Sequence, residues 1–116
     1  MNAVVCYYAH RLTDKDPAKQ AENLARAELR CGQLRELWKR THPERVLIAP
    51  WIDMAKAGMP ELLVWPFILD AFWRVQVLIQ DLDGGGLSEG MLKEKTFAGP
   101  TRVSTETIDG EIGGES

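Results

Sequence analysis

The sequence predicts an α/β fold in which helices cover both faces of a mostly parallel sheet of four to five strands. The class is indicated by short apolar segments that alternate with longer segments that show helical spacing. A hydrophobic content of 45% over 116 residues is ordinary for a globular protein and argues against a disordered or fibrous one. A chain of this length has room for one domain, which we expect to span residues 1–108. Residues 109–116 are acidic and rich in glycine, and we expect them to form a flexible tail.

The first half of the chain predicts two buried strands joined by a long helix. Residues 3–9 and 46–49 are short apolar runs, a pattern typical of strands that are buried on both faces of a sheet. Apolar side chains recur at helical spacing over residues 17–40, and Asp16 followed by Pro17 is a typical helix start. We therefore expect a strand, a helix and a second strand in this order.

The second half of the chain predicts two more helices and two more strands. Residues 52–60 contain Gly58 and Pro60, and we expect them to form a loop over the strand ends. The predicted elements after this loop are a helix over residues 61–74 bent at Pro66, a third strand over residues 75–82, a helix over residues 88–98 and a weak last strand over residues 102–107.

The segment between the third strand and the next helix is the most informative one for function. Three glycines at residues 84–86 are followed by Ser88 and Gly90 at the expected helix start. The unpaired N–H groups of a first helical turn can hold an anion or a hydroxyl-rich sugar, and Ser88 also fits the N-cap position. Glu94 lies six residues after Ser88, so on a helix it faces the same pocket. The segment thus predicts a ligand-binding loop with a carboxylate behind it.

Charge and cysteine content narrow the range of functions. A net charge of -3 gives no attraction to phosphate backbones, so we expect no nucleic-acid polymer as a partner. Cys6 and Cys31 lack a metal-binding spacing, as do His10 and His42, and we expect reduced thiols and no metal site. The sequence shows neither a signal peptide nor an apolar run long enough to cross a bilayer, so we expect a cytoplasmic protein with no membrane partner.

A set of segments between residues 3 and 98 carries a resemblance to a known family. In chain order they are Tyr7-Tyr8-Ala9-His10, Asn23, Ala49-Pro50-Trp51-Ile52, Asp70, and Ser88-Glu89-Gly90-Met91 followed by Glu94. Together they resemble the nucleoside 2-deoxyribosyltransferase-like family, which includes nucleoside monophosphate N-glycosidases. The resemblance implies a small flavodoxin-like or Rossmann-like domain of three layers. It also implies an enzyme that cleaves N-glycosidic bonds in a nucleoside or nucleotide without a metal or an organic cofactor.

The resemblance further implies roles for particular residues. Glu94 is the expected nucleophile that attacks the anomeric carbon of the sugar, Tyr7 orients it, and Asp70 assists at the base or the sugar. Two carboxyl groups in one partly buried pocket push their pKa values apart, which suits a nucleophile and an acid. Ser88 and Gly90 are expected to hold the 5′ end of the nucleoside. The other residues expected to contact the substrate are Met91, Tyr8, His10, Asn23 and Trp51.

Two departures from the family pattern keep other functions open. Relatives often have an aspartate where this chain has Leu78, and Gly99-Pro100 shortens the last helix. The main alternative is therefore a module that binds a nucleotide or a nucleotide-derived signal without cleaving it. The third hypothesis is an interaction protein that has no small-molecule ligand.

The aromatic side chains predict that the chain associates with itself. They are concentrated between residues 51 and 73, in a number larger than a small sheet easily buries in one core. They are Trp51, Trp65, Phe67, Phe72 and Trp73. Because aromatic side chains are enriched in protein interfaces, we expect some of them at a subunit interface of a homo-oligomer, most simply a dimer.

Overall fold

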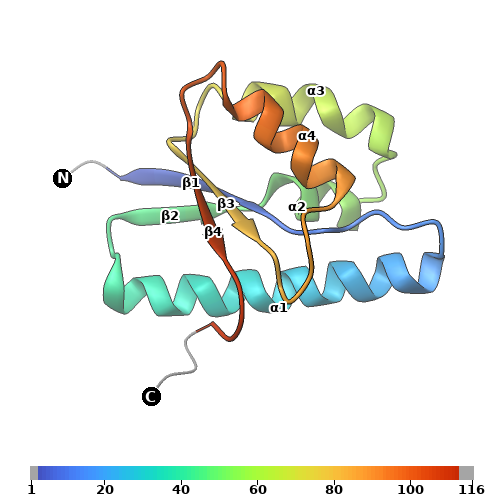
Figure 1. Ribbon diagram of the computed structural model, residues 1–116, viewed down its shortest axis with the longest axis horizontal. Helices are drawn as coiled ribbons and strands as arrows, with labels where there is room; N and C mark the ends of the chain where they lie inside the picture. Colours follow the sequence, from blue (N-terminus) through green and yellow to red (C-terminus); the bar gives the residue numbers. More distant parts are fainter. Residues whose placement is uncertain (1–2, 113–116) are drawn as a thin grey trace.

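Four parallel strands form the centre of the fold, in the order β2-β1-β3-β4 (Figure 1). The computed structural model describes residues 3–112. The strands are β1 Val4–Ala9, β2 Arg45–Ile48, β3 Val77–Asp81 and β4 Ser104–Ile108. Every neighbouring pair in the sheet is parallel. The predicted α/β class with a parallel sheet is therefore confirmed.

Helices cover both faces of this sheet. They are α1 Pro17–Thr41, α2 Pro50–Lys56, α3 Glu61–Ala71 and α4 Glu89–Ala98. Helix α1 lies on one face, and α3 and α4 lie on the other (Figure 1). This arrangement follows from right-handed crossovers, because the chain moves from β1 to β2 in one direction and from β2 to β3 and β4 in the opposite direction.

Helix α1 begins where the sequence predicts. The Asp16 side chain accepts a hydrogen bond from the N–H of Ala18 at 3.0 Å, and Pro17 occupies the first turn. The apolar side chains that α1 buries are Ala27, Cys31, Leu34 and Trp38. Although α1 has 25 residues, neither it nor any other helix within residues 3–112 combines the length and apolar character needed to cross a membrane.

The predicted loop over residues 52–60 is wrong for most of its length, because residues 50–56 form α2. Pro50 lies in the first turn of this helix, where its missing N–H and its fixed φ angle suit a helix start. The chain turns at Gly58, whose φ of 82° is a conformation that glycine adopts at no steric cost. The other predicted helices and strands are confirmed, with shifts of a few residues at their ends.

Strand β1 delivers one tyrosine to each face of the sheet, because successive side chains of a strand alternate. Tyr7 lies beside Leu78 of β3, and its hydroxyl reaches α4. Tyr8 lies beside Ile79, and its hydroxyl donates to Asp81 at 2.6 Å on the α1 side. Both tyrosines are buried. The alternation of β1 thus sets up two separate polar clusters, one under α4 and one under α1.

The chain continues past β4 along the end of the sheet. The Oδ1 atom of Asp109 accepts a hydrogen bond from the N–H of Gly84 at 2.7 Å, and Ile112 packs against the core. Residues 113–116, the rest of the predicted tail, lie outside the described residues.

Candidate active site

Glu94 and Tyr7 form the centre of the candidate site. The Tyr7 hydroxyl donates a hydrogen bond to Oε2 of Glu94, and Glu94 is only 3% exposed. Burial raises the pKa of Glu94 to about 8, although the hydrogen bond from Tyr7 acts in the opposite direction. Burial and the neighbouring carboxyl group raise the pKa of Tyr7 well above its usual value, so its hydroxyl stays protonated. At neutral pH, Glu94 is therefore a neutral carboxylic acid and Tyr7 a neutral phenol.

Local sequence explains why Glu94 faces inward. Ser88 is the N-cap of α4, because its Oγ accepts a hydrogen bond from the N–H of Met91 at 3.2 Å. From this start, helical spacing places Met91, Glu94 and Ala98 on the buried side of α4. Because α4 begins at Ser88, Glu94 faces the sheet. The predicted N-cap role of Ser88 is confirmed.

Glu94 lines a narrow cavity at the edge of the sheet. Its volume is about 10 Å³, which is close to the space that one water molecule needs. The lining residues come from the segments after three neighbouring strands, where ligands bind in parallel α/β folds. They are His10, Leu12, Thr13, Trp51, Ser88, Gly90, Met91 and Glu94.

Two wider hollows open above this cavity and share lining residues with it. One, of about 450 Å³, is bounded by Thr13, Ser88 and Gly90 together with the first turns of α3 and α4. The other, of about 510 Å³, is bounded by Leu12, Thr13 and Trp51, the start of α1 and the turn after α2. Both volumes fall within the range of small-molecule sites.

Most of the predicted site residues meet at this edge of the sheet. His10, Trp51, Ser88, Gly90 and Met91 line the narrow cavity, and Tyr7 contacts Glu94 from below. Tyr8 and Asn23 do not line it. Tyr8 lies on the α1 side of the sheet, and the Asn23 side chain donates to the carbonyl of Leu12 at 3.3 Å. Asn23 therefore supports the loop after β1, whose residues line all three hollows.

The structure does not bring Asp70 to Glu94. Asp70 is exposed and forms an ion pair with Arg74 one turn away, at 3.1 Å. It lies in the last turn of α3, which leads into the amino end of β3, so it sits at the edge of the sheet opposite the cavity. The expected pocket shared by two carboxyl groups is therefore not formed by Asp70.

A second polar cluster lies on the α1 side and was missed by sequence reasoning. Arg30 and Asp81 form a buried two-point ion pair with distances of 2.7 and 2.8 Å. Tyr8 donates to the same carboxylate. Charged residues on a helix are usually exposed, so the position of Arg30 in the sequence did not indicate that its side chain is buried. The available signal was that Asp81 and Asp83 lie at the carboxyl end of the third predicted strand.

Asp83 links this second cluster to the cavity. Its carboxylate accepts a hydrogen bond from Arg26 at 2.9 Å and contacts Nε2 of His10 at 3.0 Å. Burial by itself would raise the pKa of Asp83, but these hydrogen bonds and the charge of Arg30 lower it to about 2. Because His10 also lines the cavity, a stably ionised aspartate holds one wall of the site in place.

One glycine of the run after β3, Gly85, lies against the side chain of Arg11. Arg11 donates to the carbonyl oxygens of Leu82 and Asp83. A Cβ atom on Gly85 would lie 2.9 Å from Nη1 of Arg11, closer than such contacts occur in proteins. A larger residue at Gly85 would therefore displace the end of the Arg11 side chain and its hydrogen bonds to the loop after β3.

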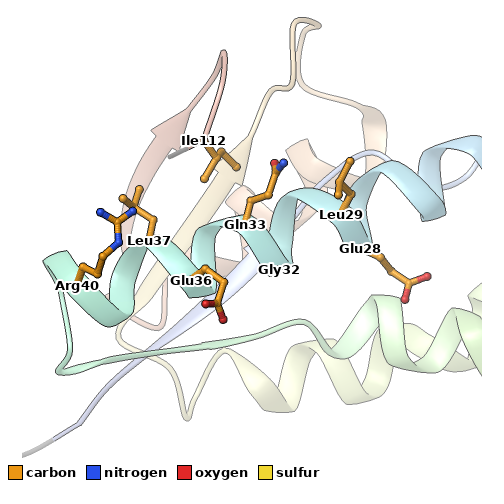
Figure 2. A pocket seen from close by; sticks show the side chains of 8 residues that line it. All are labelled: Glu28, Leu29, Gly32, Gln33, Glu36, Leu37, Arg40 and Ile112. Atoms are coloured by element: carbon orange, nitrogen blue, oxygen red, sulfur yellow. The ribbon is translucent and has the colours of Figure 1, made fainter. Parts of the chain in front are cut away.

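A separate hollow of about 700 Å³ lies on the outer side of α1 (Figure 2). Its lining residues are Glu28, Leu29, Gly32, Gln33, Glu36, Leu37, Arg40 and Ile112. The charged side chains in it are all exposed to solvent. It has no buried ionisable group comparable to Glu94, so the cavity at the sheet edge is the better candidate for chemistry. Within residues 3–112, no three His, Cys, Asp or Glu side chains converge in a way that would hold a metal ion.

The arrangement of strands and helices in this chain is shared with at least one solved structure. This chain is similar to a 2-desoxiribosyltransferase from Leishmania mexicana, with a TM-score of 0.64 and 16% sequence identity. The similarity covers 93% of this chain and 65% of that chain, so this chain spans less than two thirds of its length. At this identity, the likeness shows a common fold. No protein-family model and no curated protein matches the sequence.

Proposed function

We propose that the protein cleaves the N-glycosidic bond of a nucleoside or nucleotide and passes the sugar to water or to a second base. The observation that carries this proposal is the buried Glu94 carboxyl group, held by Tyr7 at the bottom of a cavity on the ligand-binding edge of the sheet. The fold shared with a 2-desoxiribosyltransferase supports it.

In the proposed reaction, Glu94 supplies both the nucleophile and the proton. One carboxyl oxygen forms a bond to the anomeric carbon while the carbon–nitrogen bond breaks, and the base leaves with the electron pair of that bond. The proton of the neutral Glu94 carboxyl group passes to the departing base. The products of this step are a glycosyl ester of Glu94 and a neutral base, so the step requires no second acid.

In the second step, water or another base attacks the anomeric carbon of the ester. The carbon–oxygen bond to Glu94 breaks, and the carboxyl group recovers a proton from the attacking molecule. Tyr7 is the proposed positioning residue in both steps, because its hydrogen bond to Oε2 leaves the other carboxyl oxygen available for the sugar. This hydrogen bond also stabilises the negative charge that develops when the ester breaks.

Ser88 and Gly90 are proposed to hold the 5′ end of the substrate. The Ser88 hydroxyl accepts from the N–H of Met91, so its own proton remains available to donate to a ligand oxygen. The side chain of Trp51 comes within 3.9 Å of where a Cβ atom on Gly90 would lie. An aromatic surface thus adjoins the first turn of α4, as suits a ligand that has a base at one end and a hydroxyl or phosphate group at the other.

Release of free base tests this proposal. The protein is incubated with a panel of ribonucleosides, deoxyribonucleosides and their monophosphates, and free base is measured by chromatography, with a second base added as acceptor in parallel samples. We expect base release from at least one substrate and its loss in Glu94→Gln. If no substrate yields base, or if Glu94→Gln releases base at the rate of the wild type, the proposal is wrong.

A module that binds nucleotides without cleaving them is the second candidate. It is favoured by the narrowness of the cavity beside Glu94, about 10 Å³, and by the position of Asp70 far from that cavity. This alternative predicts that a nucleotide shifts the melting temperature of the protein and is recovered intact after long incubation. It also predicts that Glu94→Gln binds the same nucleotide.

A further inference from the structure

The outer side of α3 is an apolar surface without a partner within residues 3–112. Five large apolar side chains in α3 and the turn after it are at least 40% exposed, and the most exposed are Leu62 at 86% and Trp73 at 72%. The five are Leu62, Leu63, Phe67, Leu69 and Trp73, which we call the α3 outer face. Of the aromatic residues predicted to form an interface, only Phe67 and Trp73 belong to it, because Trp51, Trp65 and Phe72 are buried in the core.

These side chains form one continuous stripe. At 100° per residue, Leu62, Leu63, Phe67 and Leu69 fall on one side of the helix, while Val64, Trp65 and Ile68 point to the core. Pro66 is exposed on the same side as the stripe. The only charged groups within the stripe are Asp70 and Arg74, which pair with each other at 3.1 Å. The surface is therefore apolar along its whole length and carries no net charge in its centre.

We propose that the α3 outer face binds the same face of a second copy of this chain. A fully exposed aromatic side chain offers about 150–250 Å² and a leucine slightly less, so the five residues leave roughly 500 Å² of apolar surface per copy. Two copies would bury about 1,000 Å² from these residues alone, which reaches the size that a specific interface needs. This proposal is independent of the proposed enzymatic activity.

The charges on this surface favour a second copy over a charged partner. The Asp70–Arg74 pair carries both signs, so an antiparallel copy related by a two-fold axis presents an arginine to an aspartate and an aspartate to an arginine. A strongly acidic or basic partner finds no complementary charge in the stripe. An anionic membrane is disfavoured by the net charge of -3.

The test compares two substitutions in the α3 outer face with a matched substitution elsewhere. Phe67→Glu and Leu62→Glu place a carboxylate in the proposed interface. Leu29→Glu is the control, because Leu29 is 52% exposed, close to the 57% of Phe67, and lies on α1 across the sheet. The mass of each variant is measured by sedimentation velocity at several protein concentrations, and circular dichroism verifies that each variant is folded.

We expect wild type and Leu29→Glu to sediment at twice the 13.0 kDa of one chain at tens of micromolar. Phe67→Glu and Leu62→Glu are expected to sediment as monomers, with dissociation constants raised about 100-fold or more, because each interface carries the substitution twice. A monomeric wild type at these concentrations overturns the proposal, as does a dimer that persists in both variants. Binding of a monomeric wild type to phosphatidylcholine vesicles, lost in Phe67→Glu, assigns the surface to a membrane and equally overturns it.

Discussion

Tyr7 and Glu94 are 87 residues apart in the chain and share a hydrogen bond beneath α4, on the side of the sheet away from α1. The tyrosine reaches this point because β1 alternates its side chains, and the glutamate because Ser88 sets the start of α4. Neither group is exposed, yet Glu94 lines a cavity of about 10 Å³ that shares lining residues with two wider hollows.

Tyr7→Phe should move the pH dependence of base release. In the proposed reaction the proton on Glu94 is transferred to the base, so kcat/KM is expected to be constant below about pH 8 and to fall as Glu94 ionises above it. The Tyr7 hydrogen bond lowers the pKa of Glu94, so its removal should shift this decline to higher pH. A pH–rate profile of both proteins measures the shift. A decline at the same pH in both would show that Tyr7 does not control the ionisation of Glu94.

Glu94→Gln should change how stability depends on pH. Because folding raises the pKa of Glu94 from 4.5 to about 8, the folded protein binds this proton more tightly than the unfolded chain does. The resulting stabilisation is complete below pH 4.5 and is lost as the pH rises to 8, by an amount on the order of 5 kcal/mol. Asp83, whose pKa is about 2, remains ionised throughout this window. Glutamine can still accept the Tyr7 hydrogen bond but has no proton to lose.

The measurement is the free energy of unfolding in urea between pH 5 and 8.5. We expect it to decline in the wild type and to stay nearly constant in Glu94→Gln. Glu89→Gln is the control, because Glu89 is an exposed residue of the same helix. Its curve should follow that of the wild type, and equal slopes in all three proteins would mean that Glu94 is not the source of the decline.

Loss of Arg30 should destabilise the protein far more than loss of Arg74. Arg30→Met leaves the buried Asp81 carboxylate without its main counter-ion, and we expect a cost of about 3–5 kcal/mol. Arg74→Met breaks an exposed ion pair and should cost at most about 1 kcal/mol. Chemical denaturation measures both values. Similar costs for the two variants would contradict the buried character of the Arg30 pair.

A second substitution should recover part of the stability lost in Arg30→Met. Asp81→Asn removes the unpaired charge. Tyr8 donates to Oδ2 and the N–H of Asp83 donates to Oδ1, so the single side-chain oxygen of asparagine keeps one of these two hydrogen bonds. The double variant is therefore expected to be more stable than Arg30→Met alone. A double variant as unstable as the sum of the two single variants would indicate that packing, not charge, dominates at this position.

Asp70→Asn should leave catalysis unchanged. The residue is exposed, pairs only with Arg74 and lies at the opposite edge of the sheet from Glu94. We expect kcat/KM to remain within about twofold of the wild type, the size of an ordinary surface effect. A large loss of kcat with unchanged stability would show that Asp70 takes part in catalysis. The active conformation would then differ from the structure described above.

Much of the fold could be predicted because short apolar segments alternate along the chain with longer segments whose apolar residues have helical spacing. Helix α2 was missed because Gly58 and Pro60 suggested a loop, whereas Pro50 is compatible with a helix start. Glu94 was identified because the glycine run and Ser88 mark the end of a strand and the start of a helix. The contact between Glu94 and Tyr7 could be predicted only from the family resemblance and from the alternation of side chains along β1.

The position of Asp70 could have been questioned from the predicted elements themselves. A residue at the end of a helix that leads into a strand lies at the amino end of that strand, while ligands bind at the carboxyl end. The role expected for Asp70 rested on the family resemblance, which does not show the direction in which the chain crosses the sheet. The Arg30–Asp81 pair could not be predicted, because a single arginine within an otherwise amphipathic helix shows no sign of burial.

The most direct test is to trap the sugar on Glu94. The protein is incubated with 2′-fluoro analogues of the nucleosides from which it releases base, because fluorine slows hydrolysis of a glycosyl ester. Intact-mass spectrometry and peptide mapping then locate any attached sugar. The proposed reaction predicts a mass increase of one fluorinated sugar residue per chain, on the peptide that contains Glu94, and none in Glu94→Gln. Base release with no attached sugar, or with the sugar on another residue, would contradict the role of Glu94 as nucleophile.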